Sequence, residues 1–222
     1  MTHFDLFETR AEITVASRRG LYTRVGKRAL DLSLSLLLLP ILLPLIVLGW
    51  VATRLQGGPG FYAHKRVGRH GRSFSCYKIR TMRVDGDTIL RNHLDRDPGA
   101  AREWAKNRKL RDDPRVTSLG RFLRRTSLDE LPQIFNVLRG DMSLVGPRPI
   151  TREELVYYDP VPATYLCQKP GVTGLWQVRG RQDGCFRNRV QLDLNYLRQV
   201  SLATDLGLIG RTALTVLFPS GC

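Results

Sequence analysis

A mainly apolar stretch runs from Leu32 to Ala52 and contains no charged residue. As a helix it would be about 32 Å long at 1.5 Å per residue, close to the thickness of the hydrocarbon core of a bilayer. Pro40 and Pro44 lie near its middle, and each removes one backbone donor from the helix. The pattern therefore predicts a membrane-embedded helix with a kink near mid-membrane.

Basic residues flank this stretch on both sides, and no Asp or Glu occurs from Leu32 through Val84. They are Arg18, Arg19, Arg24, Lys27 and Arg28 before it, and Arg54, Lys65, Arg66, Arg69 and Arg72 after it. Because basic flanks favour the cytoplasm, both ends are expected on the same face, which makes a re-entrant helix the favoured interpretation. A kinked spanning helix is the alternative. A signal peptide is disfavoured, since its basic region would be too long and no small-x-small cleavage site follows.

Two patterns after this stretch predict regular elements. Residues 61–82 alternate and turn at Gly68 to Gly71, which predicts a β-hairpin. Leu131, Ile134, Phe135 and Leu138 recur at helical spacing before Gly140, which predicts a helix with a buried stripe that stops at the glycine.

The remaining segments predict short elements. They are a partly helical polar region at 87–111 broken at Pro98-Gly99, a short amphipathic turn at 119–123, an apolar stretch at 143–150, a short helix at 152–158, a glycine-punctuated loop at 169–181, and amphipathic helices at 188–199 and 203–218. The last helix would either pack in the core or lie on the membrane surface. The predicted fold class is α+β and mainly helical: a re-entrant membrane helix, then a compact cytosolic domain with a small β-hairpin and amphipathic surface helices.

Composition adds a strong positive charge to this picture. The 222 residues include 35 Lys and Arg against 20 Asp and Glu, a formal net charge of +15. Such a balance implies an anionic partner: nucleic acid, an anionic membrane, or a phosphate-bearing substrate. The four cysteines, Cys76, Cys167, Cys185 and Cys222, are far apart and form no CxxC pair. A zinc site or disulfide framework is therefore disfavoured, and a reducing compartment fits best.

Against this background the adjacent carboxylates Asp129 and Glu130 stand out in "RRTSLDELPQ". One ordinary interpretation is a capping box, with Ser127 as N-cap and Glu130 at N3. That register would place Pro132 inside the helix, so a start at Asp129 is preferred, with Pro132 at N3 where a missing N–H does no harm. On periodicity alone, Asp129 is then an ordinary helix cap.

Nearby arginines favour a chemical role over a simple cap. A helix N-terminus attracts anions, and Arg124 and Arg125 come just before this one. Arg148 is confined between two prolines, which limits where its planar guanidinium can point. Confined arginines of this kind are typical of a phosphate-binding site.

The segments "YKIRTM", "RRTSLDELPQIFNVLRGDMSLVGPRP" and "KPGVTGLWQVRGR" carry a family resemblance. They are similar to the bacterial sugar transferase family, the monotopic phosphoglycosyl transferases that start glycan assembly on polyprenol phosphate. The resemblance covers about residues 23–217, and its motifs are long, ordered and correctly spaced. The chain resembles the small catalytic form, and "GLWQV" resembles members that transfer hexose 1-phosphate, galactose especially.

The resemblance implies a reaction and its residues. A UDP-sugar would give sugar 1-phosphate to undecaprenyl phosphate and release UMP, in a Mg²⁺-dependent reaction that initiates exopolysaccharide or other glycan assembly. Asp129 matches the family nucleophile, which forms a covalent aspartyl phospho-sugar, and Glu130 matches its partner in metal or proton handling; both are candidate metal ligands. The candidate substrate-binding residues are Lys78, Arg80, Arg124, Arg148, Gln177 and Arg181.

The implied setting is the cytoplasmic face of the bacterial inner membrane. The expected partners are a UDP-sugar, undecaprenyl phosphate and anionic lipids, without nucleic acid; the oligomeric state is left open, with a homodimer among the alternatives. The expected organisation is an N-terminal segment at 1–22, a membrane anchor at 23–56 and a catalytic domain at 57–222. The competing function is a membrane-anchored basic module that binds nucleic acid without catalysis, although no helix-turn-helix, zinc-finger or RNP pattern occurs.

Overall fold

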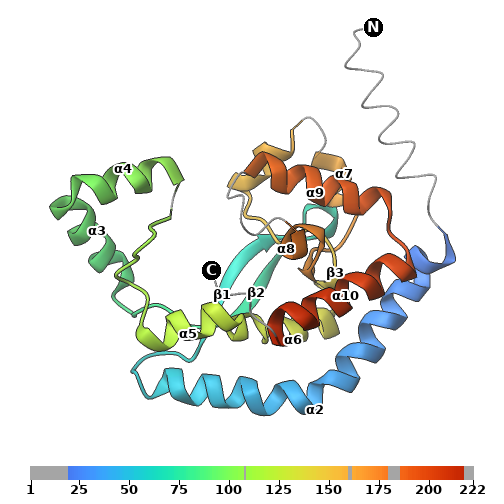
Figure 1. The fold of residues 1–222 in the computed structure, drawn as a ribbon, viewed down its shortest axis with the longest axis horizontal. Helices are drawn as coiled ribbons and strands as arrows, with labels where there is room; N and C mark the ends of the chain where they lie inside the picture. The colour runs from blue at the N-terminus through green and yellow to red at the C-terminus, as the bar shows by residue number, and fades with distance from the viewer. Residues whose placement is uncertain (1–19, 108, 160–161, 180–185, 218–222) are drawn as a thin grey trace, which may run out of the picture. The chain divides into compact units, whose positions relative to one another are not determined.

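The computed structural model describes residues 20–107, 109–159, 162–179 and 186–217 (Figure 1). The chain forms two compact units. Unit 1 comprises Met1–Leu42, Ala63–Tyr77 and Pro132–Cys222, and unit 2 comprises Leu43–Tyr62 and Lys78–Leu131. The predicted segments 1–22, 23–56 and 57–222 concern membrane attachment rather than compactness, and they stay predictions.

The long apolar stretch forms helix α2 (Lys27–Arg54), preceded by a π-helical turn, η1 (Tyr22–Gly26). Helical structure from Tyr22 to Arg54 is long and apolar enough to cross a membrane, and its most apolar window has a mean hydropathy of 2.6 with only 11% of residues buried. The helix assignment continues through Pro40 and Pro44, and the division between the two units falls between these prolines. The re-entrant path of this helix stays a prediction.

The predicted hairpin is confirmed. Strands β1 (Phe61–Val67) and β2 (Ser73–Ile79) form a two-stranded sheet, joined through a short 3₁₀ turn, η2 (Arg69–Gly71). In unit 1, Phe74 and Cys76 of β2 pack with Val137 and Met142 in one core cluster.

A second sheet in unit 1 consists of two short parallel strands, β3 (Ser143–Val145) and β4 (Gly171–Thr173). Ser143 pairs with Gly171, and Val145 pairs with Thr173. The prediction that 169–181 is a loop was therefore wrong in part, because β4 and a short helix, α8 (Leu175–Arg179), lie within it. The glycines that suggested a loop instead allow close backbone packing, as described for the site below.

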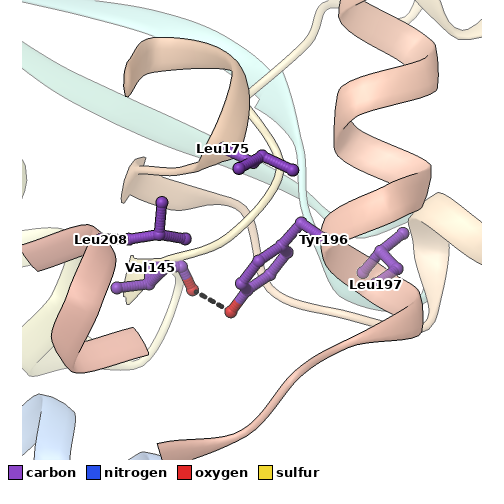
Figure 2. Packing of buried hydrophobic residues seen from close by; sticks show 5 residues of the cluster. All are labelled: Val145, Leu175, Tyr196, Leu197 and Leu208. Atoms are coloured by element: carbon purple, nitrogen blue, oxygen red, sulfur yellow. Dashed lines mark hydrogen bonds between the residues drawn. The ribbon is translucent and has the colours of Figure 1, made fainter. Parts of the chain in front are cut away.

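Helices α9 (Phe186–Arg198) and α10 (Leu202–Leu217) confirm the two predicted C-terminal helices. Their buried residues form a core with Val145 and Leu175 (Figure 2). In Figure 2 the Tyr196 ring lies in this cluster, and its hydroxyl donates a 3.2 Å hydrogen bond to the Val145 carbonyl. Leu208 of α10 is 4% exposed, so the core-packing alternative holds for that face of the helix. Leu214 is 58% exposed, and a membrane contact there stays a prediction.

Helix α6 (Gln133–Arg139) confirms the helix predicted before Gly140, which ends it with a φ of +90°. Its start differs from both predicted registers, because Pro132 occupies the N-cap position. Buried Asn136 ties α6 to β2: its side chain accepts a hydrogen bond from the Tyr77 N–H and donates one to the Ser75 carbonyl. The chain before Pro132 already turns helically, which explains why Asp129 does not cap α6.

A third core cluster of unit 1 joins the hairpin to the segment after the Pro-Arg-Pro motif. The predicted short helix at 152–158 is a 3₁₀ helix, η4 (Glu153–Tyr158), and it is followed by α7 (Pro162–Leu166). Val67, Ile150, Tyr158 and Tyr165 form the buried cluster. Val67 also pairs with Ile150 in an isolated antiparallel bridge.

Unit 2 carries the helices α3 (Gly86–Arg96), α4 (Pro98–Asn107) and α5 (Ser118–Thr126), followed by a 3₁₀ turn, η3 (Leu128–Glu130). The predicted break at Pro98 is confirmed, because Asp97 ends α3 and its side chain accepts from the N–H groups at the start of α4. In α5, Gly120 lies so close to the Thr81 backbone that a Cβ atom there would clash. Both units together confirm an α+β, mainly helical fold.

Candidate functional site

The Asp129–Glu130 pair lies in unit 2, in the 3₁₀ turn between α5 and the segment that leads to α6. Helix α5 ends at Ser127, a non-glycine residue in the left-handed region with a φ of 59°. Such a conformation is uncommon for residues other than glycine, asparagine and aspartate, and it often marks functional sites. Here it redirects the chain so that Asp129 becomes buried, with 7% of its surface exposed.

Lys78, near the end of strand β2, supplies the positive charge at this pair. Its Nζ lies 2.6 Å from Glu130 Oε1 and 3.9 Å from Asp129 Oδ2. The first distance is that of a charge-assisted hydrogen bond, and the second is an ion pair without one. Lys78 thus forms ion pairs with both carboxylates but hydrogen-bonds only to Glu130.

Burial raises the pKa of the Asp129 carboxyl, and the neighbouring Glu130 charge raises it further. The positive charges of Lys78 and Arg124 act in the opposite direction and lower it. A carboxylate with a raised pKa and little hydration is more basic than an exposed one, and it is a better nucleophile once it is deprotonated. Asp129 therefore stays a candidate nucleophile.

Two other predicted arginines of unit 2 have different surroundings. Arg124 is exposed on α5, and its Nε donates a 2.9 Å hydrogen bond to Thr81 Oγ1. Arg80 donates to the backbone carbonyls of Thr53 and Gly57, at the C-terminal end of α2. A cation there is stabilised by the helix dipole. Arg80 therefore holds the end of α2, and its predicted contact with substrate stays a prediction.

Arg148 lies in unit 1, where its guanidinium stacks over the ring of Trp176 with 5.2 Å between the guanidinium carbon and the ring centroid. Glycines allow the "VGPRP" segment, which contains Arg148, and the "GVTGLW" segment, which contains Trp176, to pack closely. A Cβ atom on Gly171 would clash with the Gly146 backbone, and one on Gly174 would clash with the Gly146 carbonyl. Close backbone packing at these glycines is therefore the reason that the "VGPRP" and "GVTGLW" segments lie side by side.

The backbone around Arg148 is anchored by a buried tyrosine. The Tyr165 hydroxyl lies 3.1 Å from the Arg148 carbonyl, to which it donates, and 3.3 Å from the Ile150 N–H, from which it accepts. Gln177 of α8 is 8% exposed, and neither atom of its side-chain amide has a hydrogen-bond partner among the described residues. A buried amide of this kind is able to bind a ligand. Arg181, the last predicted substrate-binding residue, lies outside the described residues.

Sequence reasoning missed a buried group beside Arg148. Arg189 and Asp193 of α9 are 7% and 0% exposed, and the Tyr158 hydroxyl donates a 2.6 Å hydrogen bond to Asp193 Oδ2. Burial raises the pKa of Asp193 to about 6. Arg189 and Asp193 are spaced i, i+4 on a predicted amphipathic helix. This spacing could have indicated a pair, because two charged residues four apart lie on the same face of a helix.

Asp129 and Glu130 of unit 2 are the candidate magnesium ligands. Within the described ranges, no group of three or more His, Cys, Asp or Glu side chains could hold a metal. Mg²⁺ commonly binds through one or two carboxylates, with water and substrate phosphate oxygens completing its octahedron. Asp129 and Glu130 are adjacent in the chain and would supply two such carboxylates.

Comparison with known proteins assigns the family. The bacterial sugar transferase family profile matches residues 22–219. The chain is 48% identical over 199 residues to an undecaprenyl-phosphate galactose phosphotransferase of Salmonella typhimurium, covering 90% of this chain but 42% of that protein. It is 43% identical to the exopolysaccharide production protein ExoY of Sinorhizobium fredii, covering 89% of this chain and 88% of that protein.

A third relative is a UDP-glucose:undecaprenyl-phosphate glucose-1-phosphate transferase of Caulobacter vibrioides, 39% identical over 86% of this chain and 69% of that protein. The names of these relatives describe sugar phosphotransfer to undecaprenyl phosphate and exopolysaccharide production. The family profile covers nearly the whole chain and includes the Asp129–Glu130 turn, the Pro-Arg-Pro segment and α8. The chain therefore belongs to the bacterial sugar transferase family.

Proposed function

We propose that the protein is an enzyme that transfers sugar 1-phosphate from a UDP-sugar to undecaprenyl phosphate and releases UMP. The observation that carries this proposal is the buried Asp129 carboxylate, held in a strained turn with Lys78 and Glu130 beside it. The named activities of the Salmonella and Caulobacter relatives support the same reaction. The glycan that is built is proposed to be an exopolysaccharide, as the name of the Sinorhizobium relative suggests.

In the first step, a carboxylate oxygen of Asp129 attacks the phosphorus that carries the sugar. A bond forms between Asp129 and this phosphorus, the bond to the bridging oxygen breaks, and UMP leaves with the electron pair. The attack meets like-charge repulsion of about 4 kcal/mol for one pair of charges at ~4 Å and an effective dielectric of ~20. Lys78 lies where it offsets part of this repulsion, because its ammonium faces both carboxylates.

In the second step, a phosphate oxygen of undecaprenyl phosphate attacks the same phosphorus. The bond to Asp129 breaks and its carboxylate is restored, leaving a polyprenol diphosphate that carries the sugar. A mixed carboxylic–phosphoric anhydride is reactive enough to pass its phosphoryl group to another phosphate. A single aspartate therefore suffices for both transfers.

Asp129 and Glu130 are the residues that would hold Mg²⁺. A bound magnesium ion supplies charge neutralisation on the phosphate oxygens. Because Lys78 already contacts Glu130 at 2.6 Å, this lysine and the cation would share the carboxylate or exchange places on it.

We further propose that the enzyme works at the cytoplasmic face of the inner membrane. The exposed leucines of α2 and its basic flanks support membrane attachment, and the phosphate of a polyprenol stays at the membrane surface. Anionic lipids would be attracted by the net charge of +15.

The test measures UMP release from a panel of UDP-sugars by the full chain in detergent with Mg²⁺ and undecaprenyl phosphate. The expected result is release with one or a few hexose donors. Without undecaprenyl phosphate, the protein is expected to gain the mass of one sugar phosphate on the peptide that contains Asp129.

Two results would contradict the proposal. Absence of UMP release with every donor would exclude the reaction, and an adduct on a different peptide would exclude Asp129 as the nucleophile. Asp112→Asn is a matched control, since Asp112 is an exposed aspartate of the same unit. This variant is expected to keep both activity and adduct.

A further inference from the structure

Arg189 is a buried cation with two donor atoms that no described residue partners. It is 7% exposed, and its Nε and Nη2 atoms have no hydrogen-bond partner among the described residues. Two carboxylates lie near it, but not close enough for a hydrogen bond: Nη1 is 3.9 Å from Glu154 Oε1, and Nε is 4.0 Å from Asp193 Oδ2. A guanidinium buried with unmade hydrogen bonds is costly, so these donors are available for a ligand.

Arg189 shares an aromatic platform with Arg148. The guanidinium carbon of Arg189 lies 5.5 Å from the centroid of the Trp176 ring, and that of Arg148 lies 5.2 Å from the same centroid. A second ring, Phe186, lies 4.7 Å from the Arg189 guanidinium. Stacking on aromatic rings fixes the plane of a guanidinium and leaves the N–H edges free to bind. Both arginines are thus held in defined orientations beside one tryptophan.

The local charge of this region is positive. Arg66 also lies here, and burial together with the charges of Arg148 and Arg189 lowers its pKa. The Nη1 atom of Arg66 lies 3.1 Å from Glu154 Oε2, so Glu154 already forms an ion pair with Arg66. Three arginines therefore face two carboxylates, Glu154 and Asp193, which favours an added anion.

We propose that Arg189 is a second phosphate-binding arginine that acts together with Arg148 and is oriented by Trp176. The inference rests on the proposed function only for the identity of the ligand, which is either the diphosphate of the UDP-sugar or the phosphate of the polyprenol. The shared chemistry is a phosphate group that accepts hydrogen bonds from two planar guanidinium groups. Bidentate arginine–phosphate contacts are stronger and more directional than those of lysine.

Direct binding of inorganic pyrophosphate to the full chain in detergent, measured by calorimetry, tests this without any turnover. Arg189→Gln should weaken binding about tenfold or more, the loss expected for one charged hydrogen-bonding group. Arg187→Gln is the matched control, because Arg187 is an exposed arginine of the same helix. It should leave binding unchanged. Wild-type protein that does not bind pyrophosphate, or a folded Arg189→Gln variant that binds it normally, would overturn the proposal.

A second variant covers the case in which Arg189→Gln does not fold. Arg189→Lys keeps a positive charge near Asp193 and Glu154 but loses the planar fork, so it should fold and still bind pyrophosphate more weakly. A purely structural role for Arg189 predicts normal binding by this lysine variant, which would also overturn the proposal.

Competition experiments then distinguish the two sources of phosphate. If Arg189 contacts the donor, Arg189→Lys should weaken binding of UDP and raise the KM for UDP-sugar more than it lowers kcat. If it contacts the acceptor, the variant should instead weaken binding of undecaprenyl phosphate. Unchanged affinity for both would contradict the inference. If the wild-type protein binds pyrophosphate but releases no UMP, and the Arg189 variants lose that binding, Arg189 is supported as a phosphate ligand while the proposed reaction is refuted.

Discussion

The ammonium group of Lys78 lies 2.6 Å from a carboxylate oxygen of Glu130, and it also approaches Asp129 to 3.9 Å. One lysine near the end of strand β2 therefore bridges both members of the carboxylate pair. It holds Glu130 by a hydrogen bond and lowers the pKa of Asp129 through its charge. Burial raises the pKa of Asp129, and Lys78 opposes that rise without forming a hydrogen bond to the carboxylate.

Replacing Lys78 with methionine should therefore impair the reaction. The pKa of Asp129 would rise further, Glu130 would lose its hydrogen bond from Lys78, and the repulsion of the substrate phosphate would no longer be offset. We expect UMP release at pH 7 to fall at least tenfold, equivalent to about 1.4 kcal/mol or more of lost transition-state stabilisation. Lys65→Met is the control, since Lys65 is exposed on β1. Normal turnover in Lys78→Met would exclude this role.

Replacing Asp129 with asparagine should abolish activity without loss of stability. Burial raises the pKa of Asp129, so its charged form is disfavoured in the folded protein, and a neutral amide removes that cost. The expected unfolding midpoint is equal to or above that of the wild type. Asp113→Asn is the contrasting variant: hydrogen bonds from Arg115 lower the pKa of Asp113, and its loss should lower the midpoint. A destabilised Asp129→Asn protein would contradict the prediction.

Asp205 of α10 is expected to be a strong stabilising residue of unit 1. It is fully buried, and it accepts hydrogen bonds from Lys27 at 2.6 Å, Tyr22 at 2.6 Å and Tyr196 at 2.8 Å. Asp205→Ala would leave the Lys27 ammonium buried without its partner, a change that typically costs about 3–5 kcal/mol. The free energy of unfolding in detergent is the measurement.

A double variant separates the ion pair from packing. Lys27→Met combined with Asp205→Leu removes both charges and should recover most of the stability lost in Asp205→Ala. If the double variant is as unstable as the single one, the loss arises from packing rather than from the unpaired lysine.

Asp193 should make stability depend on pH. Its pKa is about 6 in the folded protein against an ordinary value of 3.8, so the folded state binds an additional proton between these two values. The contribution of this group to stability therefore increases as the pH falls from 7 to 5, by about 1 kcal/mol, and is lost as the pH rises through 6. The groups that face Asp193 are Tyr158, Arg189 and Arg148.

The measurement compares unfolding midpoints at pH 5 and pH 7 for the wild type and Asp193→Asn. The asparagine variant should show a smaller gain at pH 5, because it has no proton to bind. An identical pH response in both proteins would assign the effect to other groups.

Membrane topology is tested by labelling single cysteines on each side of α2. Gly20 and Gln56 are exposed positions before and after the helix. In a background without native cysteines, Gly20→Cys and Gln56→Cys should both react with a membrane-impermeant reagent only after the inner membrane is opened. Reaction of one of them in intact spheroplasts would show a spanning helix instead. Replacing Pro40 and Pro44 with leucine should increase the spanning fraction.

Local patterns in the sequence were sufficient for most of the elements. The apolar stretch at 32–52, the alternating residues at 61–82 and the stripe that ends at Gly140 each predicted an element that is confirmed. These signals are reliable because they depend on neighbours within a few residues: hydrophobic periodicity, turn glycines and helix stops. The carboxylate pair was also recognisable, because Asp129 and Glu130 are adjacent in the chain.

Only the tertiary structure decided which distant residues act on these groups. Lys78 meets Glu130 although 52 positions separate them, and Arg189 reaches the tryptophan on which Arg148 stacks. The start of α6 was predicted wrongly for a similar reason, since the turn through Ser127 and the burial of Asp129 depend on packing around η3. Burial, pKa shifts and unmade hydrogen bonds arise from contacts between segments far apart in the chain, and a sequence pattern records only the spacing within one segment.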